Sequence, residues 1–181
     1  MIEPILVVPY SDNWAAEFTK IGALVRHALG STALRIDHIG STSVKGLHAK
    51  PIVDIQISVE KLEPSEQYKA AMESIGFNHR ADNPDLSKRY FRESPGHNRT
   101  HIHVRQYGSL SEQFALLFRD YLRAHPVDCE RYACMKLALA ELYRYEREKY
   151  VDAKEPIIWD ILRKASRWSQ LTGWRPAASD M

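Results

Sequence analysis

The sequence is poor in cysteine and has no long hydrophobic run. Its 181 residues include two cysteines, Cys129 and Cys134, five positions apart in a segment with helical periodicity. This is not a metal-site spacing, and residues at that offset on a helix do not face each other, so we expect reduced thiols, as in the cytosol. No apolar run approaches the ~20 residues that span a bilayer. The N-terminal sequence also lacks the pattern of a signal peptide, in which a charged region is followed by an apolar one. These absences predict a cytoplasmic protein without a membrane partner.

Strong net charge and the common nucleotide-binding fingerprints are also missing. The net charge is +2, which gives no strong signal for a nucleic-acid partner. Neither Gly-x-x-x-x-Gly-Lys-[Ser/Thr] nor Gly-x-Gly-x-x-Gly occurs. Basic residues do crowd one region, where they form either a wall for an anionic substrate or an ordinary solvated face. They are Arg80, Lys88, Arg89, Arg92, Arg99 and Arg105.

The hydrophobic pattern predicts a mixed order of helices and strands. The predicted helices cover about 11–29, 64–75, 109–124, 126–150 and 157–168, and the predicted strands 33–39, 52–59, 88–92 and 100–105. This order favours an α+β fold, with a small mixed β-sheet flanked by helices and a C-terminal helical portion. The length suits one domain, which we assign to 1–170. Residues 171–181 are rich in Gly, Pro and small side chains and predict a loose C-terminal tail.

A strand, a hydroxyl-rich turn and an acidic strand make up the most informative stretch of the chain. Gly40 has no Cβ, so its backbone can approach a ligand closely. Ser41, Thr42 and Ser43 offer hydroxyl and backbone N–H groups to phosphate oxygens. Asp54, inside an apolar run, is placed to hold a hard divalent cation against the same phosphates. The same composition is common in ordinary turns, and a strand-end Asp is often only a cap.

Two histidines alternate in the last predicted strand. His101 and His103 point to one face, which suits half of a metal site, a general base or a phosphate-binding cation. The structural alternative is a half-buried strand whose polar face carries histidine. His38, just before the Gly40 turn, is interpreted as a buried, hydrogen-bonded strand histidine.

Two groups of helical residues offer further phosphate ligands. Arg119 either reaches the phosphates or forms an ordinary surface pair within its helix. Lys136, Tyr143 and Tyr150 are spaced by seven and lie along one stripe. Such a stripe can stack a base and bind its phosphates, or it can be a helix-packing face.

Four motifs in this order resemble the GrpB family. They are His38-Ile-Gly-Ser-Thr-Ser-Val44, Ala49-Lys-Pro-Ile-Val-Asp54, Thr100-His-Ile-His-Val104 and Phe118-Arg-Asp-Tyr-Leu-Arg123. The resemblance covers about 5–168. The GrpB family is grouped with the nucleotidyltransferase superfamily and also occurs fused to dephospho-CoA kinases. The resemblance therefore implies a nucleotidyltransferase-like fold.

The resemblance also implies a site. Nucleotidyltransferases use a Gly-Ser turn for the triphosphate and an Asp-x-[Asp/Glu] pair for magnesium; Gly40, Ser41 and Asp54 match this pattern. Gln56 stands where the second acid is expected, and it brings a carbonyl but no charge. If it faces the cleft, Gln56→Glu is expected to tighten magnesium binding. Magnesium or manganese is the expected ion, and zinc or nickel become alternatives if histidines replace the missing acid.

Three functions fit these residues. The first is a divalent-metal-dependent nucleotidyltransferase that binds a nucleoside triphosphate and transfers a nucleotidyl group to a small-molecule acceptor. In it, Asp54, His101 and His103 hold the metal, and Asp54 and His103 are catalytic. The expected phosphate ligands are Gly40, Ser41, Thr42, Ser43, Lys50, Arg119 and Lys136. The alternatives are a non-catalytic, regulatory nucleotide-binding module and a metal-dependent phosphoesterase that uses Asp54, His101 and His103.

Overall fold

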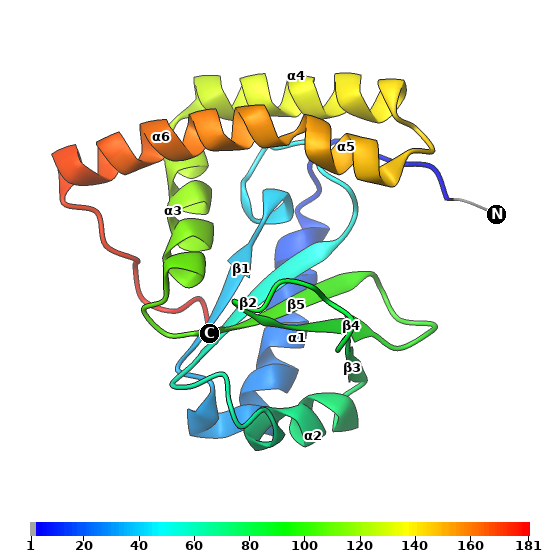
Figure 1. Cartoon of the computed structure of the whole chain (residues 1–181), viewed down its shortest axis with the longest axis vertical. Helices are drawn as coiled ribbons and strands as arrows, with labels where there is room; N and C mark the ends of the chain where they lie inside the picture. The colour runs from blue at the N-terminus through cyan, green and yellow to red at the C-terminus, as the bar shows by residue number, and fades with distance from the viewer. Residues whose placement is uncertain (1–2) are drawn as a thin grey trace.

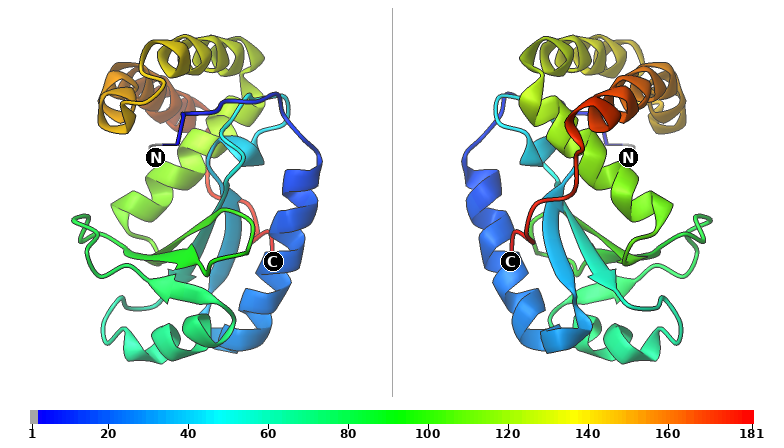
Figure 2. Two further views of the ribbon diagram at one scale, coloured as in Figure 1. Left: turned by 90° about the vertical axis from the view of Figure 1, so that its right-hand side faces the viewer. Right: turned by 90° about the vertical axis from the view of Figure 1, so that its left-hand side faces the viewer.

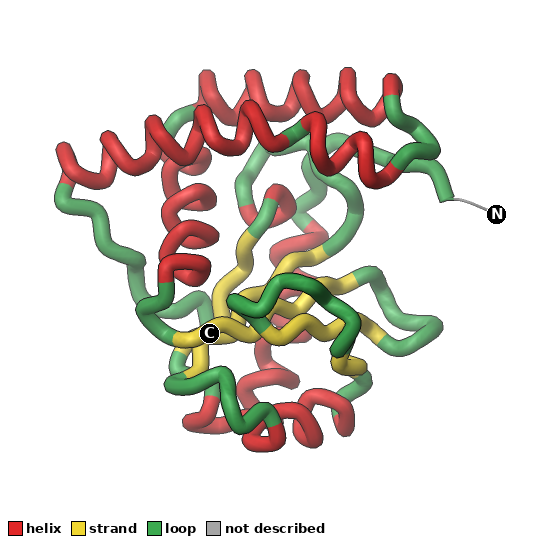
Figure 3. The backbone as a smooth tube through the Cα atoms, viewed as in Figure 1, coloured by secondary structure: helices red, strands yellow, loops and turns green. Residues whose placement is uncertain are grey.

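Five strands and six α-helices make up the chain in the computed structural model, which describes residues 3–181 (Figure 1 and Figure 3). The strands are β1 (Arg35–Ile39), β2 (Val53–Val59), β3 (Phe77–His79), β4 (Arg89–Glu93) and β5 (Thr100–Gln106). The helices are α1 (Asn13–Leu29), α2 (Glu66–Ser74), α3 (Leu110–Ala124), α4 (Pro126–Leu142), α5 (Arg147–Ala153) and α6 (Glu155–Thr172). The predicted α+β class, with a C-terminal helical portion, is confirmed.

The strands form one mixed sheet in the order β1-β2-β5-β4-β3. Only β2 and β5 run parallel, and the other neighbours are antiparallel. In this register Asp54 lies opposite His101, and Gln56 lies opposite His103. The topology therefore places the predicted acid and the predicted histidine pair on adjacent central strands.

The two faces of the sheet differ in chemistry because side chains alternate along each strand. Ile55, Ile57, Ile102 and Val104 are fully buried against the apolar stripes of α1 and α2. The opposite face carries the polar side chains of β2 and β5, and α3 covers part of it (Figure 2). Polar groups left uncovered by α3 are consequently free to form a site.

The C-terminal helices build a second core that ends at the Gly40 turn. Side chains of α3, α4 and α6 enclose Val44 and Leu47, which follow that turn. Ser109 caps the start of α3, because its hydroxyl accepts the Glu112 N–H at 3.4 Å. The helix predicted to reach about residue 150 instead ends at Leu142. Two residues beyond this end, the Arg144 carbonyl accepts the Ile5 N–H (2.7 Å) from the distant N-terminal segment.

The segment predicted to be a loose tail lies along the outer edge of β1, which corrects the prediction. The Ile36 N–H donates to the Ser179 hydroxyl (2.8 Å), and the His38 N–H donates to the Asp180 carboxylate (2.9 Å). The Met181 N–H donates to the Ile36 carbonyl (3.2 Å). An edge strand has unpaired backbone groups on its open side, and a segment of small residues can approach them closely.

Ion pairs occupy most of the predicted basic cluster. Arg80 pairs with Asp82, Lys88 with Asp85, Arg89 with Glu63, Arg92 with Glu93, and Arg99 with Glu3. These contacts favour the interpretation of an ordinary solvated face. Within residues 3–181, no helix has both the length and the apolar content that crossing a membrane requires.

Candidate metal and phosphate site

A carboxylate and two imidazoles converge on the polar face of the sheet. The Oδ1 atom of Asp54 lies 3.3 Å from Nδ1 of His101 and 3.3 Å from Nε2 of His103. One ligand atom from each residue lies within 4.8 Å of the others, which is close enough for one metal ion. The predicted convergence of Asp54, His101 and His103 is therefore present.

The charges in this cluster suit metal binding. Burial raises the pKa of Asp54, but hydrogen bonds and positive charge from His101 and His103 outweigh it and hold that pKa well below its ordinary value. Burial also lowers the pKa of His103, although Asp54 opposes this shift. At neutral pH the site therefore contains an ionised carboxylate and a neutral imidazole, the forms that bind metals.

The Gly40 turn closes directly over Asp54. Gly40 has a φ of 70°, which disfavours any side chain. A Cβ at this position would lie 2.6 Å from Oδ2 of Asp54. The close approach predicted for Gly40 therefore includes a protein carboxylate. It joins the turn to the group of Asp54, His101 and His103, a candidate metal site that we call the metal cluster.

The three hydroxyl residues after Gly40 have different environments. The Ser41 hydroxyl accepts from Nζ of Lys136 (2.9 Å) and lies at an open cavity. The buried Thr42 hydroxyl donates to the Ile52 carbonyl (3.3 Å) and lies 3.0 Å from Nε2 of His38, as expected for a hydrogen-bonded strand histidine. Ser43 turns away, because its hydroxyl donates to the Gly40 carbonyl (2.6 Å) and its side chain lines a different cavity.

A cavity of about 260 Å³, which we call the lysine cavity, lies beside the metal cluster. It is lined by Gly40, Ser41, Thr42, Ala49, Lys50, Ile52, Asp54, His101, Tyr132, Lys136, Tyr150 and Lys154. Its three lysines lie over aromatic rings: Nζ of Lys154 is 4.5 Å and Nζ of Lys50 is 5.7 Å from the centre of the Tyr150 ring, and Nζ of Lys136 is 4.6 Å from that of Tyr132. The rings orient the ammonium groups while leaving them able to bind an anion.

Burial and neighbouring positive charges lower the pKa values of all three lysines in the lysine cavity. Burial, assisted by repulsion from Lys154 and Lys50, lowers the pKa of Lys136 to about 7. Burial and the charge of Lys50 lower the pKa of Lys154 to about 8. Burial and Arg147 also lower the pKa of Lys50. A bound polyanion would relieve this repulsion, as expected for a phosphate site.

Arg119 does not reach the lysine cavity. Its side chain is 2% exposed and donates to the Asp120 carboxylate (2.8 Å), the His38 carbonyl (3.1 Å) and the Asp180 carboxylate (3.0 Å). These contacts tie α3 to β1 and to the C-terminal segment. The sequence interpretation of Arg119 as a phosphate ligand is therefore replaced by a structural role.

Gln56 lies next to the metal cluster but is fully buried. Its amide oxygen accepts from Nη1 of Arg105 (2.5 Å), and its amide nitrogen donates to the Glu112 carbonyl of α3 (3.4 Å). Both polar ends are occupied. Among the described residues, the metal cluster therefore contains His101 and His103 but no second acid.

Tyr132 and Lys154 belong to the cavity but were absent from the predicted phosphate set. Tyr132 precedes Lys136 by four residues, so the two share a helix face, and this spacing was a usable signal. Tyr150 does line the cavity, whereas Tyr143, the middle member of the predicted stripe, does not, because α4 ends before it.

Comparison with known proteins relates this arrangement to a family. The family model described as GrpB protein matches residues 4–164. The UPF0157 protein YqkA of Bacillus subtilis is 32% identical over 164 residues, which are 91% of this chain and 48% of YqkA. A dephospho-CoA kinase of Mycobacterium tuberculosis is 31% identical over 198 residues, covering 96% of this chain and 49% of the kinase. The chain thus spans about half the length of these relatives.

Solved structures extend the comparison. The crystal structure of the conserved protein GrpB from Enterococcus faecalis is 30% identical, has a TM-score of 0.83, and the match covers 91% of this chain and 99% of that one. A more distant match is Cid1 in complex with its short product ApU, at 16% identity and a TM-score of 0.48, covering 71% and 42%. Because the family model spans most of the sequence and the E. faecalis structure follows nearly all of its fold, the chain belongs to the GrpB family.

Proposed function

We propose that the chain binds a nucleoside triphosphate with a divalent metal ion and transfers its nucleotidyl group to a small-molecule acceptor. One observation carries the proposal: Asp54 and His101, two of the three residues of the Asp54, His101 and His103 cluster, line a cavity with three lysines. A cation site beside a concentrated positive charge suits a chain of phosphates better than a neutral ligand.

The donor set of the cluster fits a metal ion. Asp54, His101 and His103 would hold it through one carboxylate oxygen and two imidazole nitrogens. Two imidazoles with one carboxylate suit manganese, zinc or nickel better than magnesium, which prefers oxygen ligands. When bound, the ion would supply positive charge to the phosphate oxygens.

The lysine cavity suits the phosphates rather than the whole nucleotide. Its volume, about 260 Å³, is slightly below the usual range for small-molecule sites. Ser41 and Thr42 would position the phosphates, and Lys50, Lys136 and Lys154 would neutralise them. An acceptor oxygen would form a bond to the α-phosphorus while the bond from that phosphorus to the bridging oxygen breaks, releasing pyrophosphate. His103 would serve as a metal ligand or take the acceptor proton.

A second candidate function is nucleotide binding without turnover. The burial of Gln56 favours it, because the cluster then has one carboxylate and less negative charge to hold two metal ions. In this case the chain would act as a regulatory module. The same domain makes up about half of a relative named dephospho-CoA kinase, an arrangement compatible with such a role.

Calorimetry and product analysis test the proposal together. ATP, GTP, CTP and UTP are titrated with and without Mn²⁺ into the wild type, Asp54→Asn and, as a charge-matched control, Asp152→Asn on the exposed surface of α5. We expect at least one triphosphate to bind in the presence of the metal, and Asp54→Asn alone to lose that binding. Pyrophosphate release that requires an added alcohol, amine or phosphate acceptor would support nucleotidyl transfer.

Other results of these experiments would support a different function. Binding without pyrophosphate release would favour the regulatory module, and metal-dependent hydrolysis without an acceptor would favour a phosphoesterase. Equal metal-dependent binding by the wild type and Asp54→Asn would contradict the assignment of Asp54 as a ligand.

A further inference from the structure

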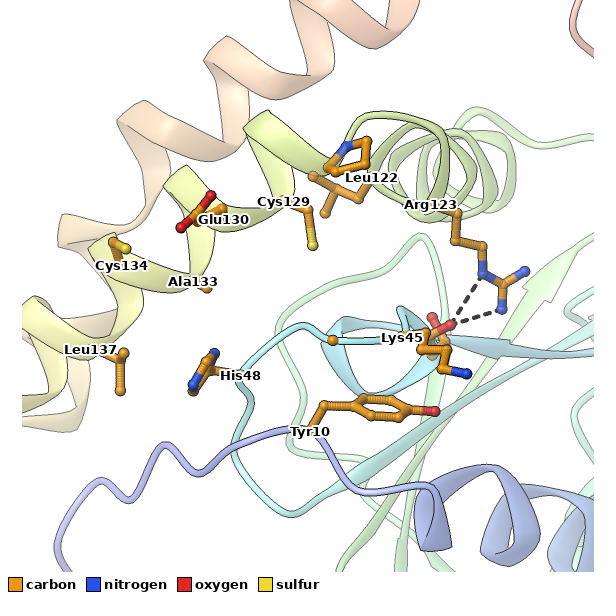
Figure 4. Close-up of a pocket in the computed structure, with 13 residues that line it drawn as sticks. Tyr10, Lys45, His48, Leu122, Arg123, Cys129, Glu130, Ala133, Cys134 and Leu137 are labelled. Carbon is orange, nitrogen blue, oxygen red and sulfur yellow. Dashed lines mark hydrogen bonds between the residues drawn. The ribbon is translucent and has the colours of Figure 1, made fainter.

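A second cavity, which we call the rear cavity, lies on the other side of the Gly40 turn and has a volume of about 610 Å³ (Figure 4). Cys129, Ala133 and Leu137 of α4 form one wall, and Tyr10 and His48 lie across from them. Its size is within the range of small-molecule sites. Neither the metal cluster nor the lysines of the lysine cavity line it.

The segment after Gly40 and helix α4 separate the two cavities, and each of them lines both. In the segment after Gly40, Ser41, Thr42 and Ala49 line the lysine cavity, whereas Ser43, Lys45, Gly46 and His48 line the rear cavity. Along α4, Tyr132 and Lys136 line the first, and the neighbouring stripe of Cys129, Ala133 and Leu137 lines the second. A ligand in the rear cavity would therefore contact the back of the elements that form the lysine cavity.

The lining of the rear cavity defines a ligand chemistry. Leu122, Ala133 and Leu137 give an apolar wall, and Tyr10 and His48 add two flat rings. Lys45 and Arg123 bring positive charge to one side. Arg123 lies 3.8 Å from the Asp120 carboxylate, whereas Lys45 forms no ion pair in the described part of the chain. Arg123 is held in place because its guanidinium donates to the Ser43 carbonyl at 2.9 and 3.1 Å. Glu130 is the acid of the lining, and it lies on α4 rather than beside Lys45 (Figure 4).

We propose that the rear cavity is a second ligand site, for a small organic anion with a flat apolar body, and that its occupancy tightens anion binding in the lysine cavity. The flat body would lie between α4 and the rings of Tyr10 and His48, with the anionic group at Lys45 and Arg123. The coupling rests on the proposed phosphate role of the lysine cavity, but the binding does not.

A hydrogen-bonded connection carries the coupling. Nζ of Lys136 donates both to the Ser41 hydroxyl in the lysine cavity and to the carbonyl of His48, whose ring lines the rear cavity. A ligand that contacts His48 would fix the position of the His48 carbonyl, and through it the position of the Lys136 ammonium that faces the lysine cavity. A correctly placed ammonium binds a second anion more tightly.

The probe for the rear cavity is 8-anilinonaphthalene-1-sulfonate, an aromatic sulfonate with a flat naphthalene ring, whose fluorescence rises in apolar surroundings. We expect saturable binding at one site in the wild type. Lys45→Glu should weaken it by about tenfold, the effect of one charge-assisted hydrogen bond. Leu137→Trp should abolish it by filling the cavity, whereas Leu142→Trp, the same change on the exposed end of α4, should not.

Cysteine labelling locates the probe independently. Cys134 is exposed and lines the rear cavity, whereas Cys129 is buried. Saturating probe should slow the reaction of Cys134 with iodoacetamide, and Cys134→Ser identifies that reaction. If Lys45→Glu, Leu137→Trp and Leu142→Trp all bind the probe as the wild type does, the rear cavity is not its site and the proposal fails. Lys45→Glu decides the matter even if Leu137→Trp does not fold.

Inorganic tripolyphosphate tests the coupling. Its dissociation constant should fall by at least about fivefold when the probe saturates the rear cavity, and Leu137→Trp should remove this effect. An unchanged constant would overturn the coupling. Probe binding without any binding of tripolyphosphate would overturn the coupling and the phosphate role of the lysine cavity, while the rear site would stand.

Discussion

At the scale of single residues, Gly40 and Asp54 define the site by their closeness. The carboxylate occupies the space that a side chain at position 40 would need. A glycine in a turn usually indicates a positive φ angle, but Gly40 also leaves the space that the Asp54 carboxylate occupies. The Gly-Ser turn and the metal cluster are therefore one structural unit.

Gly40→Ala should weaken metal binding more than it disturbs the turn. The new Cβ would push the Asp54 carboxylate away from His101 and His103, in addition to the cost of about 1–3 kcal/mol for a side chain at positive φ. Gly108→Ala is the matched control, because Gly108 has a φ of 72° and no atom near its missing Cβ. Both variants should lose stability in urea denaturation, but only Gly40→Ala should lose Mn²⁺ affinity in calorimetry. Equal Mn²⁺ affinities would mean that the carboxylate can move without loss.

Gln56→Glu should leave metal affinity unchanged, which replaces the expectation from sequence that it would tighten magnesium binding. Arg105 would neutralise the new carboxylate, and the amide donor to the Glu112 carbonyl would be lost. The unsatisfied carbonyl should lower the free energy of unfolding by about 1–3 kcal/mol. The exposed Gln106→Glu serves as the control in calorimetry and urea denaturation. Tighter Mg²⁺ binding by Gln56→Glu would show that its carboxylate does face the metal cluster.

Sequence reasoning found the residues of the site whose partners are set by strand alternation. His101 and His103 share a face because side chains alternate along a strand. Asp54 lies on the same face because it is opposite His101 in the neighbouring strand. Gln56 and Arg119 were harder to interpret, because their partners are 56 and 61 residues away, in α3 and the C-terminal segment. Such contacts leave no local pattern.

At the scale of elements, α4 and the junction of α5 and α6 supply the charge of the site. Lys136 lies on α4, and Lys154 lies between α5 and α6, so two separate elements must pack correctly to form the lysine cavity. The break before α5 brings Lys154 and Tyr150 toward Lys50. That break has no glycine or proline signal, which is why periodicity extended the helix too far.

Raising the pH should weaken anion binding while it stabilises the free protein. The pKa values of Lys136 and Lys154, about 7 and about 8, lie below the ordinary lysine value of 10.5. As pH rises through these values, the cavity loses the positive charge that binds tripolyphosphate. Over the same range and up to 10.5 the unfolded chain holds more protons than the folded one, so the free energy of unfolding rises with pH.

Calorimetry with tripolyphosphate and urea denaturation, each between about pH 6.5 and pH 9, measure the two slopes. Lys154→Met should flatten both curves near pH 8, whereas Lys149→Met, an exposed lysine on α5, should flatten neither. Because tripolyphosphate also loses protons in this range, the comparison between variants decides: the same pH dependence of affinity in the wild type and in Lys154→Met would mean that Lys154 does not bind the anion.

At the scale of the whole molecule, the C-terminal segment joins parts of the chain that are distant in sequence. Asp180 accepts from the His38 backbone and from Arg119 of α3, and the Trp174 indole donates to Asp120 (3.1 Å). The sheet, α3 and the end of the chain are thereby connected around one buried arginine. Composition alone, rich in small and polar residues, favoured a loose tail because it contains no information about the open edge of β1.

Asp180→Ala should lower the free energy of unfolding by about 1–3 kcal/mol, because Arg119 and the His38 N–H each lose an acceptor. Asp152→Ala, the same change on the exposed surface of α5, should have little effect. A double-mutant cycle with Arg119→Met, followed by urea denaturation, isolates the pair. Purely additive effects would indicate that Asp180 acts through the His38 backbone alone.

The position of this segment also bears on how copies of the protein meet. Backbone groups of Ile36 and His38 that would otherwise be open to another strand are occupied by Ser179, Asp180 and Met181. At the opposite edge, β3 has only three residues and offers little length for pairing. Removal of the C-terminal segment would therefore leave the backbone groups of β1 open to pairing with a strand of another molecule. Residues 179–181 thus protect this edge of the sheet from aggregation.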